Sequence, residues 1–440
     1  MFKHISVKRN ALTVGKYVHS ANSIINSVRA IGKNAEFYKT LKFEDIPGPR
    51  SYPVIGTLYN YLPMIGDYKA ESLDKNAWLN WRRYGSLVRE VPLVKLLHVF
   101  DPEDIEAVFR QDDRYPARRS HVAINGPDWW RLRSAFQKNF TSPQSVRGHI
   151  QNIDSVTREF IQWIKQKKVS ENEDFLYHLN RLNLEGKLAS FNMIHGCFVI
   201  GKVAFNESFN SFSENEQDVE SRSSKVIAAA FGSNSGIMKL DKGFLWKMFQ
   251  TPLYKKLAKS QEYLEKVSTK ILIERIHFFD NENIVSDHSL LGSFLQQDNV
   301  DFKDIVGMMV DILMAAIDTT AFSTSFALYH LARNPKAQEK VYSEVKTLLP
   351  NEDSKITAET LSNAEYTRSC IKESLRLNPV SIGTVIVTQN MIASRLPQFV
   401  QDPLAFKPER WQRSSCHHES IHPFTSLPFG FGPRSYNLDY

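Results

Sequence analysis

The sequence is poor in cysteine. Its 440 residues contain only three, Cys197, Cys370 and Cys416, at scattered positions. A disulfide framework or a zinc site needs more cysteines, or cysteine and histidine at close and regular spacing. Neither pattern occurs, which argues against a disulfide-stapled secreted domain and favours a reducing interior compartment.

Acidic residues are absent from the start of the chain, where Glu36 is the first. The same stretch carries several serines and six basic residues, Lys3, Lys8, Arg9, Lys16, Arg29 and Lys33. This composition is typical of a mitochondrial transit peptide, which we predict for residues 1–36. An endoplasmic-reticulum anchor would need roughly 18 consecutive apolar residues, and the stretch has no such run. A basic tail without a targeting role is the alternative.

The bulk composition is otherwise ordinary. Nineteen glycines, nineteen prolines and 42% hydrophobic residues argue against a fibrous or linker protein and provide for a large core. The net charge of +7 has two interpretations, a mildly basic surface or a positive face for an acidic protein or an anionic membrane. No base-reading motif accompanies the charge, so nucleic-acid binding is not expected.

A proline–glycine segment, IPGPR at residues 46–50, interrupts the chain because two prolines around a glycine cannot continue a helix. We expect a hinge at residues 37–50, between the transit peptide and a folded domain at 51–440. Short strands are expected at Val54–Ile55 and within Leu87–Phe100. Most of the remainder has helical periodicity, so the predicted fold class is mainly α with small β sheets.

Two long helices are predicted. The first covers residues 301–333 and ends before Asn334, a good helix cap that is followed by a proline suited to a first turn. Its middle is nearly all apolar, but Asp311 and Asp318 would be costly in lipid. A buried central helix is therefore expected rather than a membrane span. The second helix covers residues 364–377.

Four short motifs occur in the second half of the chain: AAIDTT at 315–320, ESLR at 373–376, FKPERW at 406–411 and FGFGPRS at 429–435. Each is weak alone. In this order, and preceded by Trp129 and Arg133, they resemble the cytochrome P-450 family over essentially the whole chain from Pro47. The resemblance implies the cytochrome P-450 fold, in which a long central helix lies over a b-type haem. It also implies a haem-dependent monooxygenase that uses O2.

The resemblance implies a structural role for Glu373, Arg376 and Arg410. The first two lie at i and i+3, on one helix face. In the family they form an internal ion network with the later arginine, which locks the segment that leads to the haem ligand. Loss of one member of a buried charged network costs about 3–5 kcal/mol. A surface helix pair is the alternative.

Cofactor-binding residues follow from the same resemblance. Trp129 and Arg133, four residues apart, are expected to bind one haem propionate, and Arg434 the other, because a guanidinium suits a carboxylate. Phe429 and Gly430 of the terminal motif are further expected haem contacts. Taken alone, the tryptophan–arginine pair would indicate core packing beside a solvated charge.

Oxygen chemistry is expected at the AAIDTT motif. Ala315 and Ala316 are small enough for dioxygen to lie against the helix, although the family usually has glycine in place of Ala316, which implies a tighter groove. Thr319 would offer its hydroxyl to the oxygen and Asp318 would relay protons, so these two are the expected catalytic residues. Without the companion motifs, an aspartate and a threonine that bond back within their own helix would be the interpretation.

Three departures from the family pattern stand beside the resemblance. Tyr436 occupies the position of the axial cysteine, whose thiolate supports O–O cleavage, whereas tyrosine is the haem ligand of catalases. The helix that follows this position in the family is missing, so the fold is expected to be incomplete at the C-terminus. The chain is also short near residues 382–384 and 121–125. Skipped exons or a misassembled gene would explain these gaps, and a working truncated variant is the alternative. A catalytically inactive cytochrome P-450-like protein is therefore the second functional hypothesis.

The expected substrate comes from resemblance alone. The sequences of segments such as residues 114–121 and 126–133 resemble those of the insect mitochondrial members that hydroxylate ecdysteroid precursors at carbon 22. This implies a steroid-like apolar substrate, a location on the matrix side of the inner mitochondrial membrane, and a monomer. Electrons would come from NADPH through a reductase and an acidic, adrenodoxin-like ferredoxin.

Two partner surfaces are predicted. Arg368 and Lys372, four residues apart on one helix, are expected to bind the ferredoxin, although an ordinary solvated face has the same pattern. Residues 243–249 mix large apolar side chains with lysine and are expected to make peripheral membrane contact. Core packing is the alternative for that segment.

Overall fold

The computed structural model describes residues 42–69, 72–92, 95–112, 125–140, 143–167, 173–185, 205, 207–216, 218–240, 249–282, 290–295, 297, 299–379 and 386–434. The predicted transit peptide, residues 121–124 and 382–384, and Tyr436 lie outside these described residues.

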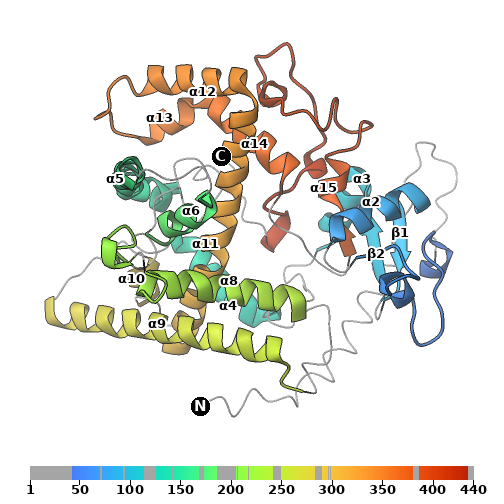
Figure 1. The fold of residues 1–440 in the computed structure, drawn as a ribbon, viewed down its shortest axis with the longest axis horizontal. Helices are drawn as coiled ribbons and strands as arrows, with labels where there is room; N and C mark the ends of the chain where they lie inside the picture. Colours follow the sequence, from blue (N-terminus) through green and yellow to red (C-terminus); the bar gives the residue numbers. More distant parts are fainter. Residues whose placement is uncertain are drawn as a thin grey trace. The chain divides into compact units, whose positions relative to one another are not determined.

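The described chain divides into two compact units (Figure 1). Unit 1 combines Met1–Gly126 with Ser381–Ala405 and Glu419–Ser435, and unit 2 combines Pro127–Val380 with Phe406–His418 and Tyr436–Tyr440. Helices predominate, and the strands of the described residues form one small sheet. The predicted fold class, mainly α with little β structure, is confirmed.

Unit 2 is helical throughout its described parts. Its elements are α4 (Gly126–Phe140), α5 (Pro143–Lys167), α6 (Phe175–Glu185), η6 (Glu214–Glu216), α8 (Arg222–Leu240), α9 (Pro252–Glu282), α10 (Leu290–Leu295), α11 (Phe302–Arg333), α12 (Pro335–Leu348), α13 (Ala358–Asn363), α14 (Glu365–Leu377) and η8 (Pro408–Trp411). The largest hydrophobic cluster joins residues of α8 and α9 to the first half of α11.

Helix α11 runs through unit 2, with α8 and α9 against one part and α12 and α14 against another (Figure 1). Its 32 residues span roughly 48 Å. Asp301 and Asp304 form a capping box at its start, which satisfies two backbone N–H groups reciprocally. Among the described residues it is the one helix long and apolar enough to cross a membrane, but 67% of that apolar stretch is buried. The prediction of a central buried helix is confirmed.

The junction after α11 differs from the expectation in one respect. Asn334 precedes α12, but its side chain makes no capping hydrogen bond there. Its Nδ2 donates to the carbonyl oxygen of His330, at 2.7 Å. Asn334 is also the C-cap of α11, and this bond satisfies one of the carbonyls at the end of that helix.

Unit 1 holds a three-stranded sheet. Strand β1 (Leu87–Glu90) pairs antiparallel with β2 (Leu96–Val99), and β2 pairs parallel with β3 (Ile386–Thr388). Helices α2 (Leu73–Tyr84), α3 (Pro102–Arg110) and α15 (Asn390–Ala393) belong to the same unit, with the short helices η2 (Phe43–Asp45), η3 (Leu58–Tyr61), η9 (Pro423–Thr425) and η10 (Gly432–Arg434). The strands predicted within Leu87–Phe100 are confirmed.

The strand predicted at Val54–Ile55 was wrong. Tyr52 and Gly56 exchange backbone hydrogen bonds of 2.8 and 3.0 Å, so the residues between them form a tight turn. Val54 has a φ of 69° and points into solvent. Proline at the second position of the turn and glycine at its end outweigh the β propensity of valine and isoleucine.

The described part of the expected hinge, residues 42–50, is bound to the sheet of unit 1. Phe43 and Ile46 are buried. Arg89 donates its backbone N–H to the oxygen of Pro47 (2.9 Å) and its Nε to the oxygen of Ile46 (2.7 Å). Gly48 is required at this contact, because a Cβ there would lie 2.0 Å from the oxygen of Arg89.

Candidate active site

Glu373 and Arg376 of the ESLR motif and Arg410 of the FKPERW motif form one buried cluster between α14 and η8. Arg376 donates Nε and Nη2 to the two oxygens of Glu373 at 2.9 and 2.8 Å, and Arg410 donates Nε at 3.0 Å. All three side chains are fully buried. The structure therefore brings together the three residues that the sequence singled out.

Sequence reasoning missed two further donors to the same carboxylate. Trp411 Nε1 lies 2.9 Å from one Glu373 oxygen, and the backbone N–H of Lys407 lies 3.0 Å from the other. With five donors the buried carboxylate is well satisfied, which offsets the cost of removing it from water. The tryptophan next to the PERW arginine was the available signal.

One face of α11 is open although the rest of its middle is buried. Gly307, Asp311, Ala315 and Thr319, spaced four residues apart along the helix, are exposed. A Cβ added at Gly307 would meet no atom within 4 Å. Ala316 and Asp318 are buried on other sides of the helix. The two expected catalytic residues therefore lie on different faces of α11.

The carboxyl of Asp318 is held by a residue that sequence reasoning missed. Asn234 of α8 donates its Nδ2 to one Asp318 oxygen at 3.0 Å and to the carbonyl oxygen of Met314 at 2.7 Å. The other oxygen has no hydrogen-bond partner among the described residues. Burial raises the pKa of Asp318 to about 6, and the hydrogen bond from Asn234 acts in the opposite direction.

Several carbonyls of this part of α11 accept side-chain hydrogen bonds. Thr319 donates its hydroxyl to the oxygen of Ala315 at 2.6 Å, and Asn183 of α6 donates to the oxygen of Ile317 at 2.9 Å. Asn234 also donates to the oxygen of Met314, so the carbonyls of residues 314, 315 and 317 each accept a side-chain hydrogen bond. Such competition weakens the hydrogen bonds of a helix locally.

Asp311 is the one carboxyl on the open face of α11. Burial raises its pKa to about 6, and no compensating hydrogen bond accompanies the shift. Its residue surface is nevertheless exposed along this face.

Helix α4 carries Trp129 and Arg133. Arg133 is buried, and Trp129 is half-buried beside Trp130, with ring centroids 5.9 Å apart. Between them in sequence, Arg131 forms two hydrogen bonds with the carboxylate of Asp304 at the start of α11. This ion pair fixes α4 against α11, and its contribution was not predictable from spacing.

Arg368 and Lys372 lie on α14 as expected, with a third cation beside them. Partial burial and then the positive charges of Arg368 and Arg413 lower the pKa of Lys372. Lys372 and Arg413 are exposed. We call these three residues the basic surface.

The terminal motif begins in unit 1. Gly430 and Gly432 have φ values of 74° and 76°, a left-handed conformation that glycine adopts without strain. Phe429 is half-buried, and Phe431 between the glycines packs on Phe424 with ring centroids 4.8 Å apart. Arg434 ends η10.

A family model described as cytochrome P450 matches residues 47–435. The chain belongs to the cytochrome P450 family. This makes it an oxidoreductase of the monooxygenase type, with haem as the cofactor that the family implies.

This cytochrome P450 is similar to curated proteins along most of its length. Cytochrome P450 302a1, mitochondrial, of Drosophila melanogaster is 36% identical over 89% of this chain and 84% of its own. Ecdysone 20-monooxygenase of the same organism is 25% identical over 89% of this chain and 79% of its own. The crystal structure of the cytochrome P450DA heme domain matches with a TM-score of 0.65 at 18% identity, over 89% of this chain and 86% of that chain, which shows the shared fold.

The described residues of this cytochrome P450 fit a haem. The open face of α11 presents only glycine, alanine, threonine and one carboxyl, and a Cβ added at Gly307 would meet no atom within 4 Å. Arg133, a cation on a helix bound to α11, suits a haem carboxylate. The described residues contain no group of three His, Cys, Asp or Glu that could hold a metal ion. The expected axial position, Tyr436, lies outside them.

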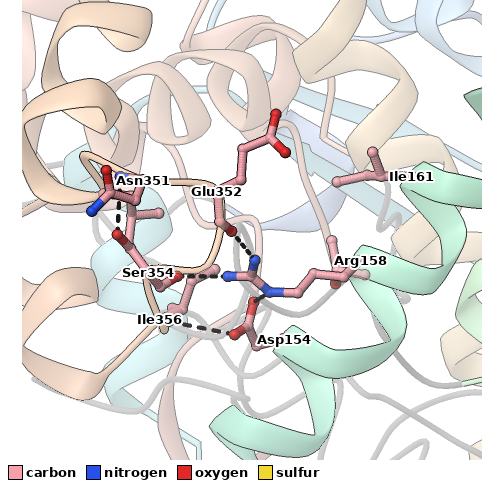
Figure 2. Close-up of a pocket in the computed structure, with 9 residues that line it drawn as sticks. Asp154, Arg158, Ile161, Asn351, Glu352, Ser354 and Ile356 are labelled. Atoms are coloured by element: carbon pink, nitrogen blue, oxygen red, sulfur yellow. Dashed lines mark hydrogen bonds and ion pairs between the residues drawn. The ribbon is translucent and has the colours of Figure 1, made fainter.

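A separate depression of about 250 Å³ lies between α5 and the loop after α12 (Figure 2). Arg158 donates to the carbonyl oxygens of Glu352 and Ser354 and to Asp154, and Asp154 accepts from the backbone of Ile356. These groups bind one another and join the loop to α5. The depression contains none of the expected site residues, and we assign it a structural role.

Proposed function

We propose that this cytochrome P450 is a mitochondrial enzyme that hydroxylates a steroid, an ecdysteroid precursor, with O2 and electrons from a ferredoxin. The observation that carries the proposal is the open face of α11, where small residues and a single carboxyl leave room for a large, mostly apolar molecule. Relatives named mitochondrial, and one named for ecdysone, support the compartment and the substrate class.

Each part of the site would have a separate task. Haem, when bound, supplies the activation of O2. Trp129, Arg133 and Arg434 would bind its carboxylates, and Thr319 would present its hydroxyl on the open face. Asp318 would hold and release a proton, for which a pKa near neutrality is suited. The Glu373 cluster would keep the segment after α14 in place.

The basic surface would bind the ferredoxin. Arg368, Lys372 and Arg413 are close enough for their charges to depress the pKa of the lysine, and such a concentration of charge attracts an acidic protein. The expected membrane contact at residues 243–249 lies outside the described residues except for Phe249, which is 65% exposed. A peripheral contact with the matrix side of the inner membrane, by a monomer, remains part of the proposal.

Reconstitution tests this function. The full chain, loaded with haem, would be supplied with NADPH, reductase, ferredoxin, ¹⁸O2 and ecdysteroid precursors that lack the 22-hydroxyl. We expect a product that contains one atom of ¹⁸O. Turnover of other steroids but not of these would overturn the substrate class, and absence of product from haem-loaded, reducible protein would overturn the activity.

A second candidate function rests on Tyr436. If this residue stands at the axial position, the chain lacks the thiolate and is a non-catalytic haem protein that binds an apolar ligand or the ferredoxin. The absorption of the reduced carbon monoxide complex distinguishes the two candidates. A strongly red-shifted Soret band requires a thiolate and would exclude the second candidate. An unshifted band would exclude the first.

A further inference from the structure

The amide of Asn234 has a defined orientation. One of its groups lies 2.7 Å from the carbonyl oxygen of Met314, which can only accept a hydrogen bond, so this group is the NH2. The same NH2 lies 3.0 Å from one oxygen of Asp318. That oxygen is therefore an acceptor in both protonation states of the carboxyl.

In the neutral form of Asp318, the proton is consequently on the carboxyl oxygen that does not accept from Asn234. The oxygen that accepts from Asn234 cannot also direct a proton toward the amide, so the proton belongs on the other oxygen. That oxygen has no partner among the described residues. The carboxyl itself is buried, with 7% of its residue surface exposed.

No other charged group of the described residues contributes to the raised pKa of Asp318. The buried charged side chains of α6 and α14 have partners other than Asp318: Arg181 and Glu185 on α6, and Glu373 and Arg376 on α14. His178 of α6 lies 2.9 Å from Glu173, and Tyr366 and Cys370 of α14 pack together in a separate buried cluster. The charged residues of α8 and α12, and those of α9 up to His277, are exposed or half-buried. Burial and the bond from Asn234 are the two causes of the Asp318 shift.

We propose that Asn234 is a positioning residue that makes Asp318 a one-sided proton donor. It holds one carboxyl oxygen as acceptor and leaves the acidic proton on the other. When Asp318 gives up this proton to a base it becomes a carboxylate, which the amide then stabilises by a charge-assisted hydrogen bond. The use of this proton in turnover rests on the proposed function, but its location does not.

Asn183 provides a matched control. Like Asn234, it is on a neighbouring helix and donates its amide to an α11 carbonyl, that of Ile317. It has no hydrogen bond to Asp318. Asn183→Ala and Asn234→Ala therefore remove the same kind of interhelical bond, and only the second releases the carboxyl.

Infrared spectroscopy of the full chain tests the proposal without turnover. The carbonyl stretch of protonated Asp318, assigned by its loss in Asp318→Asn, is expected at the frequency of a hydrogen-bonded carbonyl. In Asn234→Ala we expect it at higher frequency, with the pKa of Asp318 raised by about one unit. Asn183→Ala should leave both unchanged. A free carbonyl frequency in the unaltered chain, which needs no Asn234 variant to fold, would overturn the proposal. An equal shift in both alanine variants would also overturn it.

Discussion

Arg131 donates Nη1 to one oxygen of Asp304 at 2.6 Å and Nη2 to the other at 3.2 Å. The two residues are 173 positions apart in sequence. Because Asp304 also belongs to the capping box of α11, the pair joins α4 to the first turn of the central helix. Trp129 and Arg133 take their place relative to α11 from this attachment.

Arg131→Ala should destabilise the protein by about 1 kcal/mol at neutral pH, because the pair is partly solvent-exposed. The hydrogen bond from Arg131 lowers the pKa of Asp304, so the pair stabilises the folded state above the unfolded pKa and loses this effect as pH falls through the folded pKa. Urea unfolding at several pH values measures the difference. Arg131→Lys keeps the charge but not the forked guanidinium, so its stability should lie between those of the unaltered protein and Arg131→Ala. A loss that persists in strong acid would contradict this account.

Glu373→Gln should cost about 3–5 kcal/mol, because it leaves two buried guanidinium groups without their carboxylate. Thermal unfolding of the full chain is the measurement. Glu365→Gln, at an exposed position on the same helix, is the control and should change stability by less than about 0.5 kcal/mol. Equal effects of the two substitutions would show that the cluster does not carry the stability assigned to it.

Asp318→Asn should stabilise the protein above pH 6. Burial raises the pKa of Asp318 from 3.8 to about 6, so the folded state binds the proton more tightly than the unfolded state. Wild-type stability therefore falls as pH rises between these values, and the neutral amide avoids the loss. We expect little difference below about pH 4 and a gain of about 3 kcal/mol well above pH 6. A gain independent of pH would mean that ionisation is not its cause.

Charge reversal of the basic surface should weaken ferredoxin-supported reduction. The triple variant Arg368→Glu, Lys372→Glu and Arg413→Glu should slow reduction about tenfold or more at low salt and flatten its salt dependence. Stopped-flow reduction of the haem measures both. Lys346→Glu, an exposed lysine of α12, is the control for net charge. An unchanged salt dependence in the triple variant would show that the ferredoxin does not bind at the basic surface.

Local signals were sufficient for the elements that carry the site. Helix α11 begins after Asp301 and α14 ends at Leu377, close to the predicted bounds, because caps and breakers act within a few residues. The same locality explains the error at Val54, where a proline and a glycine within the same five residues form a turn. The signal was present, and the β propensity was given too much weight.

The sequence predicted which residues belong to the site, but not all of the contacts that they make. The spacing of Glu373 and Arg376 places them on one face, and the motif order supplied Arg410. The acceptor role of Glu373 toward Trp411 depends on how the chain returns to α14. Likewise Ala315 and Ala316 are neighbours in sequence, but packing left the first exposed and buried the second.

The amino-acid sequence by itself determined the family, the helical class and the identity of the buried triad, since these depend on motifs and on spacing within single elements. Tertiary structure alone decided that Asn234 reaches Asp318 across 84 positions and that Arg413 joins the cations of α14. No spacing rule relates residues on different helices, because their approach is set by the angle and depth at which the helices pack.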